Sequence, residues 1–228
     1  MPDFQKEKLL VLEFLNAIDN ANDNNLVEII SKYTSKNFNM KCTHPFNELK
    51  GADKIAKYLW SPIKKSFKPI QRRMDIFYAG TNLVDNHSSK WVVNMGHLLG
   101  SFNNPFLGIE PTKKTVMLWY CEFYRVENNK ITEGAFFLDI LKFMQHLKLS
   151  VVPDSTGMVG FNPGPKTHDG LYFEKQSEEE GNKTLNLMMR MANRLIGEGM
   201  RTTVSDLEKD WHEDMIWWGP GGIGASYT

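Results

Sequence analysis

Residues 115–139 read TVMLWYCEFYRVENNKITEGAFFLD, and this stretch decides the fold class. Every second residue of its first half is apolar, a period of two that is typical of a β-strand, and one face is formed by Met117, Trp119, Cys121 and Phe123. The polar residues 127–130, Glu-Asn-Asn-Lys, predict a tight hairpin turn. The apolar run at residues 131–139 therefore predicts an antiparallel strand that returns along the first.

The period of two continues upstream of this hairpin as far as residue 71. One face of the first run is formed by Met74, Ile76 and Tyr78, and one face of the second by Trp91, Val93, Met95 and His97. Four strands in chain order predict an antiparallel meander. We interpret the basic run Gln71-Arg72-Arg73 at its start as a solvated strand edge rather than a phosphate-binding patch.

Helical spacing comes before the meander. Apolar residues recur every three or four positions in residues 8–18, 26–33 and 55–63, and a short alternating strand lies at residues 38–42. Residues 140–147 predict a short terminal helix. We therefore expect an α+β fold in which three N-terminal helices pack on a curved, mainly antiparallel sheet.

The chain is expected to contain more than this one domain. Residues 1–150 form the α+β unit, and the proline- and glycine-rich residues 151–180 are predicted to be a linker. Residues 181–228 repeat the beginning of the chain, because an offset of 178 residues aligns Ile29 with Leu207, Tyr33 with Trp211 and Phe38 with Ile216. This truncated second unit would expose Trp211, Trp217 and Trp218, so we expect either a fragment of a longer two-unit protein or self-association.

Composition excludes several classes of partner. The 228 residues contain 27 Lys and Arg against 27 Asp and Glu, so we expect neither nucleic acid nor a membrane surface as a partner. No apolar run approaches a membrane span, and the N-terminus does not resemble a signal peptide, so a cytoplasmic location is expected. Cys42 and Cys121 fit neither a disulfide framework nor a zinc site.

One motif resembles a nucleotide site but fails on its context. The sequence GPGGIG at residues 219–224 matches Gly-x-Gly-x-x-Gly, yet Pro220 removes one of the backbone N–H groups that would hold phosphate. No motif for zinc, nucleoside triphosphates or a nucleophilic serine is present. We therefore expect no cofactor and no metal.

Several features of residues 5–150 resemble the SnoaL-like polyketide cyclase family of the nuclear transport factor 2 (NTF2)-like superfamily. They are the turn Gly108-Ile109-Glu110-Pro111-Thr112-Lys113-Lys114, then Glu122, Arg125-Val126-Glu127, Lys130-Ile131-Thr132-Glu133, Asp139 and Gln145, in the family's order. Lys113 and Asn129 stand where the family usually has glycine. The resemblance implies a cone-shaped fold around a pocket, and a cofactor-free intramolecular aldol condensation that uses an acid/base aspartate. Asp139 matches that aspartate, and His97 resembles the family's histidine on the neighbouring strand.

Asp139 has two interpretations. It ends an apolar run, and burial would raise the pKa of its carboxyl group toward the range useful for proton transfer. Alternatively, it caps the helix at residues 140–147 by accepting hydrogen bonds from free N–H groups. From the residues alone we favour the cap, whereas the family resemblance favours the acid/base group.

The roles of His97 and its apolar neighbours also have two interpretations. A histidine on an apolar face is more often a core residue with one hydrogen bond, although it could share a proton-transfer site with Asp139. Trp91, Met95, Trp119 and Phe137 are either plain core or the lining of a pocket for a small hydrophobic or aromatic substrate, and we assign them to the inward face.

The sequence thus predicts a SnoaL-like cyclase that acts on a polyketide-like carbonyl substrate by aldol-type cyclisation, isomerisation or dehydration. The alternative is a non-catalytic small-molecule-binding or dimerising NTF2-like module, because one fold hosts many functions. A homodimer, or pairing of the tandem units, is the expected assembly.

Overall fold

The computed structural model describes residues 4–149, 152–153, 167–197, 199, 201, 203–213, 215 and 219–223. Two helices, α1 (Gln5–Asn20) and α2 (Leu26–Tyr33), open the chain. The third predicted helix is a continuous run of α3 (Ala52–Ile55), the π-helical turn η1 (Ala56–Trp60) and α4 (Ser61–Ser66). The amide of Ser61 bonds to the carbonyl oxygen of Ala56, five residues back. Pro62 has no N–H with which to continue the α-helical pattern at the next position, which fits a wider turn at this point.

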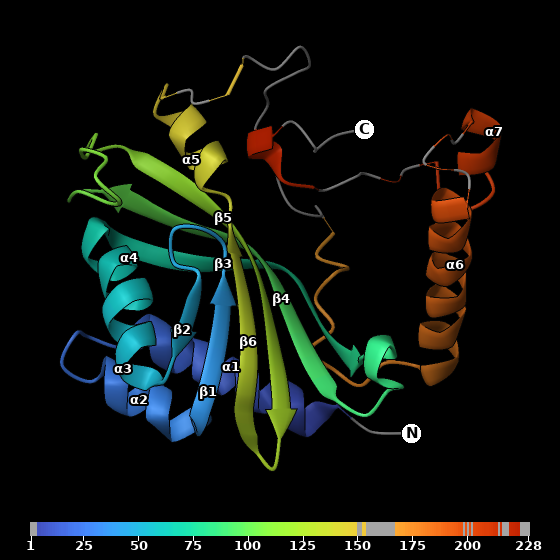
Figure 1. Ribbon diagram of the computed structural model, residues 1–228, viewed down its shortest axis with the longest axis horizontal. Coiled ribbons are helices and arrows are strands. Elements are labelled where there is room, and N and C mark those ends of the chain that lie inside the picture. The colour runs from blue at the N-terminus through green and yellow to red at the C-terminus, as the bar shows by residue number, and fades with distance from the viewer. Residues whose placement is uncertain are drawn as a thin grey trace.

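Six strands form one sheet in the order β2-β1-β6-β5-β4-β3. They are β1 (Thr34–Cys42), β2 (Glu48–Lys50), β3 (Phe67–Thr81), β4 (Lys90–Phe102), β5 (Thr115–Glu127) and β6 (Lys130–Leu138). Only β1 and β6 pair in parallel, so the predicted antiparallel meander is confirmed in β3 to β6. Helices α1 to α4 cover one face of the curved sheet, and α5 (Ile140–His146) lies across its end (Figure 1).

The inward face of the meander is the even-numbered one in β4 and β5. Val92, Leu98, Leu118 and Tyr124 are buried against the helices, whereas their odd-numbered neighbours are mostly only half-buried. The predicted choice of inward face is therefore wrong by one residue. The reason is that both faces of these strands are rich in apolar side chains, so that alternation alone does not distinguish the core from the outer face.

A β-bulge changes the phase within β3. The register with β4 shifts between Met74 and Ile76, so that Asp75 is the extra residue and Phe77 enters the core. Gly96 lies opposite Met74, and a Cβ atom there would overlap the carbonyl oxygen of Arg73. The close approach of β3 to β4 at the bulge therefore requires glycine.

Asn129 and Lys113, which stand where the family usually has glycine, both lie in turns with a left-handed backbone conformation. Asn128 and Asn129 form the hairpin between β5 and β6 with φ angles of 49° and 59°. Lys113 has a φ angle of 60°, a left-handed conformation that glycine adopts at lower cost. Both positions where the family prefers glycine thus lie in the left-handed region.

Residues 170–174 of the predicted linker lie along the edge of the sheet. Phe77 in β3 donates its N–H to the carbonyl oxygen of Gly170 at 2.8 Å and accepts from the N–H of Tyr172 at 2.8 Å. The side chain of Lys8 donates to the carbonyl oxygens of Tyr172 and Glu174. These contacts fasten the segment to both α1 and the edge strand.

The C-terminal region contains α6 (Glu178–Gly197), α7 (Val204–Leu207) and the 3-10 turn η3 (Gly221–Ile223). Helix α6 stands apart from the sheet in Figure 1, and none of its residues is buried. Two helices thus lie largely within residues 181–228, and residues 214 and 216–218, which include two of the tryptophans, lie outside the described residues. The second unit, with its boundaries at 151–180 and 181–228, stays a prediction.

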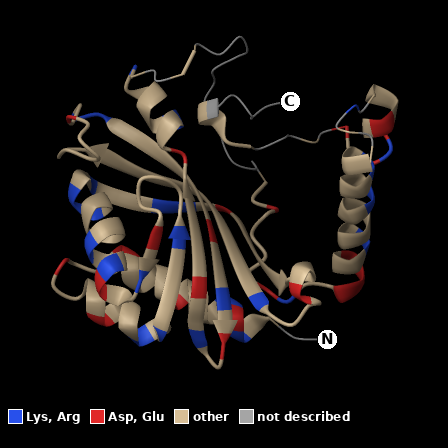
Figure 2. Cartoon of the chain, viewed as in Figure 1, with Lys and Arg blue, Asp and Glu red and all other residues tan. Residues whose placement is uncertain are grey.

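Charge is balanced over the molecule. Figure 2 shows basic and acidic residues interspersed along the helices and strands rather than gathered by sign. Within the described ranges, no helix has both the length and the apolar composition of a membrane span. The same part of the chain contains no group of three histidine, cysteine or acidic residues that could hold a metal ion.

The bulge gives the first testable prediction. Gly96→Ala should lower the free energy of unfolding by at least about 2 kcal/mol, because the added methyl group overlaps backbone atoms of β3. Gly80→Ala, also in a paired strand but with open space around the new Cβ atom, should change it by less than about 1 kcal/mol. Urea unfolding of both variants measures the difference, and equal stabilities would contradict the close approach at Gly96.

Candidate functional site

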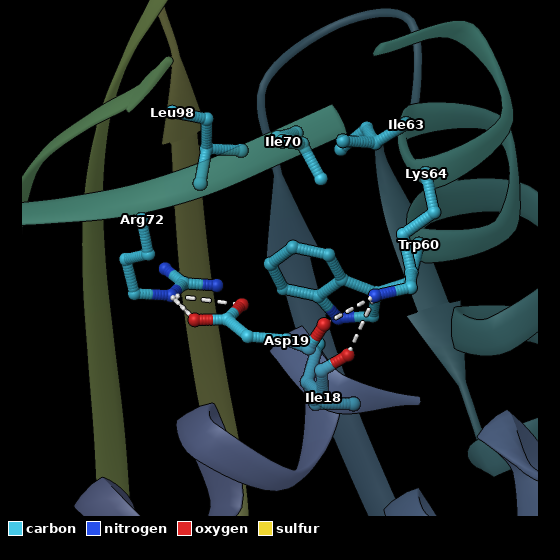
Figure 3. Close-up of a pocket in the computed structure, with 8 residues that line it drawn as sticks. All are labelled: Ile18, Asp19, Trp60, Ile63, Lys64, Ile70, Arg72 and Leu98. Atoms are coloured by element: carbon cyan, nitrogen blue, oxygen red, sulfur yellow. Dashed lines mark hydrogen bonds and ion pairs between the residues drawn. The ribbon is translucent and has the colours of Figure 1, made fainter. Parts of the chain in front are cut away.

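A buried ion-pair cluster lies between the sheet and the helices (Figure 3). Arg72 on β3 directs its Nη1 to both carboxylate oxygens of Glu122 on β5, at 3.0 Å each. Its Nε faces the carboxylate of Asp19 on α1, at 3.0 and 3.2 Å. The side chain of Arg72 is only 2% exposed, so the interpretation of this residue as a solvated edge is wrong. The guanidinium thus links two strands of the sheet to the end of a helix.

The position of Asp19 is fixed by a second cation. Lys64 on α4 donates from Nζ to the carbonyl oxygens of Ile18 and Asp19, at 2.9 and 2.8 Å. These carbonyl groups lie in the last turn of α1, where helical partners are lacking. The contact holds the C-terminal end of α1 against α4 and thereby aims Asp19 at Arg72.

Glu122 is completely buried. Asn94 on β4 donates to its Oε2 at 2.9 Å and also lies 3.2 Å from the hydroxyl oxygen of Tyr120. Burial raises the pKa of the Glu122 carboxyl group, and the neighbouring Arg72 only partly opposes that shift. A buried carboxyl group with a raised pKa and a specific charged partner is typical of sites that transfer protons.

A small cavity borders this cluster. It has room for about 10 Å³, roughly one water molecule, and is lined by Arg72, Asp19 and Trp60 together with Ile18, Ile63, Lys64, Ile70 and Leu98. The indole of Trp60 lies 5.3 Å from the guanidinium carbon of Arg72. Nη2 of Arg72 and Nε1 of Trp60 are buried and have no hydrogen-bond partner among the described residues. Two donors beside a cavity suit a small molecule that carries an acceptor oxygen.

Beyond this cavity the interior is filled with aromatic rings. Phe143 of α5 packs edge-on against Phe67, Phe102 and Phe106, with ring centroids 5.3 to 6.1 Å apart. The terminal helix therefore closes the end of the cone with a ring cluster rather than with an open mouth.

A wider groove lies elsewhere, at the end of the sheet beside α5. It has room for about 440 Å³ and is lined by Met117, Leu147, His146, Lys114 and Lys148 among others. None of the sequence-predicted site residues lines it, and neither do Arg72 and Glu122.

His97 lies on the outer face of the sheet. Its Nδ1 is 3.3 Å from Oδ2 of Asp75, the bulge residue, and its ring centroid is 4.8 Å from that of Trp119. The bulge thus directs a carboxylate at the histidine, a pairing that could orient the imidazole for proton transfer. The sequence does not indicate this partner. The face of the sheet on which Asp75 lies depends on the β-bulge, which the alternation of apolar residues does not predict.

Asp139 caps α5. Its Oδ1 accepts a hydrogen bond from the amide of Lys142 at 2.9 Å, which is the capping geometry considered from the sequence. In the register of the sheet, Trp119 stands between His97 on β4 and Asp139 at the end of β6. Two strand spacings separate the two residues by about 10 Å, so β4 and the Asp139 strand are not neighbours.

The predicted substrate-binding residues share one face, but it is the outer one. Met95 pairs with Cys121, which in turn pairs with Phe137, and Trp91 donates its indole N–H to the hydroxyl of Ser89. The side chain of Phe137 is 51% exposed and stands edge-on to Phe123. These residues form an aromatic outer surface, and the roles assigned to them stay predictions.

Comparisons with known proteins identify the fold. No family model matches the sequence, and no curated protein matches it. A protein from Jannaschia sp. CCS1, provisionally named a SnoaL-like polyketide cyclase, is similar in structure with a TM-score of 0.50 and 16% identity, over 66% of this chain and 95% of that chain.

Two further solved structures are AclR from Streptomyces galilaeus, provisionally named a hydroxylase (21% identity, TM-score 0.49, 62% of this chain and 94% of that one), and an NTF2-like protein from Burkholderia thailandensis E264 (14%, 0.46, 65% and 98%). The similarity to the Jannaschia protein shows a shared α+β fold of the SnoaL-like, NTF2-like type, so the predicted resemblance is confirmed at the level of fold.

The ion-pair cluster predicts a pH-dependent loss of stability. Arg72→Met should cost about 3–5 kcal/mol near neutral pH, because it leaves buried carboxylates without their cation. Without Arg72 the pKa of Glu122 rises further above its value in the unfolded chain. A raised folded-state pKa stabilises the fold at low pH and loses that contribution as the pH rises, so the variant should be closer to wild type at about pH 5 than at about pH 8.

Urea unfolding at the two pH values measures this effect. Arg125→Met is the matched control, since the carboxylates of Glu127 and Glu133 that it pairs with are about half exposed, and it should cost no more than about 1 kcal/mol. A loss of stability in Arg72→Met that is equal at both pH values would show that Glu122 does not take up the proton.

Proposed function

We propose that this chain is a cofactor-independent acid/base enzyme that acts on a small carbonyl-containing, polyketide-like substrate in the cone, with Glu122 as the proton acceptor. The observation that supports this most strongly is that the fully buried carboxyl group of Glu122, whose pKa is raised, bonds to the guanidinium of Arg72, which lines the cavity and has a donor without a partner among the described residues. The similarity to a protein named as a cyclase is in keeping with this chemistry.

The reaction begins with proton transfer from carbon. A C–H bond adjacent to the substrate carbonyl breaks, its proton goes to Glu122, and the electron pair moves onto the carbonyl oxygen as an enolate. Nη2 of Arg72 donates a hydrogen bond to that oxygen. The enolate carbon then bonds to a second carbonyl carbon of the same molecule, and the proton on Glu122 returns to the new alkoxide.

Entry of the substrate requires Trp60 to move. The cavity holds about one water molecule, so a ring-sized compound needs the indole to leave its position over Arg72. Trp60 ends the π-helical turn η1, and such turns are frequent at functional sites. The local irregularity of this helix places the moving residue at the cavity.

The direct test is exchange of carbon-bound hydrogen. A small β-diketone such as acetylacetone in D₂O reports proton abstraction by NMR without the natural substrate being known. Glu122→Gln should slow catalysed exchange by ~10²–10⁴, as expected when a general base is removed. Glu133→Gln removes a partly exposed carboxylate of the neighbouring strand and should leave the rate unchanged.

Two further variants separate the competing assignments. Asp139→Asn and His97→Gln test the residues that the sequence favours as catalytic. If either one abolishes exchange while Glu122→Gln keeps the wild-type rate, the site lies on the outer face and the assignment of Glu122 is wrong.

The second candidate is a non-catalytic binding or dimerising module. Two observations favour it: Asp139 is engaged as a helix cap, and aromatic rings fill most of the cone. The outer face also exposes Phe137 and Tyr78, at 51% and 43%, as a surface for a second copy. A dimer in light scattering, combined with no exchange above the buffer rate in the wild-type protein, would support the module and exclude the enzyme.

A further inference from the structure

The 3-10 turn η3 (Gly221–Ile223) lies against α5. In the sequence, helices α6 and α7 separate this turn from α5. The amide of Gly222 donates to Oδ2 of Asp139 at 3.0 Å. The side-chain amide of Gln145 donates to the carbonyl oxygen of Gly222 at 3.1 Å. Both backbone polar groups of one residue of the tail, the N–H and the carbonyl oxygen of Gly222, are therefore bonded by side chains of the N-terminal domain.

The contact leaves no space for a side chain at position 222. A Cβ atom there would overlap Oδ1 of Asp139 and would lie 2.5 Å from both Cβ of Leu141 and the amide nitrogen of Lys142. Gly222 itself is buried, although it lies near the end of the described chain. The fit thus depends on glycine at this position, which gives a structural role to a motif that lacks the context of a nucleotide site.

We infer that Asp139, Leu141, Lys142 and Gln145 form a docking notch for a glycine main chain, and that Gly221–Ile223 occupies it as an internal latch. The latch fastens the C-terminal region to the NTF2-like domain. It also engages the second oxygen of Asp139, whose first oxygen caps α5. This inference is independent of Glu122 and stands whether or not the cone is catalytic.

The two oxygens of Asp139 have separate tasks. Oδ1 accepts from the amide of Lys142 and caps α5, whereas Oδ2 accepts from the amide of Gly222 and holds the latch. Asparagine at this position keeps an oxygen for the cap, since it is a good N-cap residue. Its NH₂ group would then meet the Gly222 amide donor to donor, so Asp139→Asn should release the latch and leave α5 intact.

Hydrogen–deuterium exchange of the full chain tests the proposal. In the wild-type protein, the amide of Gly222 should be protected from exchange. Gly222→Ala should make exchange of the peptide around residues 219–223 roughly tenfold to hundredfold faster, the effect expected for losing a hydrogen bond to a charged group. Gly181→Ala is the matched control, because open space surrounds its new Cβ atom and the tail should keep its protection.

Asp139→Asn tests the same contact from the side of the notch. It should accelerate exchange in the tail as much as Gly222→Ala does, while peptides from the core strands β4 and β5 keep their protection in both variants. The double variant should show no further acceleration, since each change breaks the same contact. Wild-type protection of the tail that survives in either single variant, or a tail that is unprotected in the wild type, would overturn the proposal.

Discussion

The burial of the Arg72 guanidinium between the carboxylates of Asp19 and Glu122 is the interaction on which the rest of the structure depends. It joins the end of α1, the edge strand β3 and the central strand β5 at one point. Arginine keeps its charge when buried and offers donors in several directions, which is why one side chain can bond to two carboxylates. A buried charge of this kind adds little net stability compared with an apolar core, but the removal of one partner is costly.

Because an unpaired buried charge is costly, the residues around the cavity hold or cover the charged groups of the cluster. The helix end that carries Asp19 is fixed by Lys64, the central strand offers Asn94 to Glu122, and Trp60 covers the guanidinium. Each of these residues satisfies or shields a charge that would otherwise be left alone in the core. Nη2 of Arg72 and Nε1 of Trp60 have no hydrogen-bond partner in the described part of the chain, and both belong to residues that line the small cavity beside the cluster. The proposed proton transfer is therefore assigned to the place where the polar groups lack some of their hydrogen-bond partners.

The sequence predicted the order of the elements more reliably than the direction of their side chains. The helices, the meander, the hairpin at Asn128 and the cap at Asp139 follow from local patterns of spacing and turn chemistry, and the structure contains all of them. The local patterns did not predict which face of β4 and β5 is buried. The outer face of these strands is rich in aromatic residues, whereas the inner face contains Asn94 and Glu122. The β-bulge at Asp75 reverses which side chains of β3 point inward, and no local sequence pattern predicts it. Arg72 was similarly misjudged, because its partners lie 50 residues or more away in the sequence.

Burial should make Glu122 hold a proton more readily in the folded protein than an ordinary glutamate does. An NMR titration of the side-chain carboxyl carbons, with ¹³C-labelled glutamate and Glu122→Gln used to assign the signal, measures this directly. We expect a titration midpoint for Glu122 above the ordinary value of about 4.3. A midpoint at or below 4.3 would show that the attraction of Arg72 outweighs burial, and it would contradict the assignment of Glu122 as the proton acceptor.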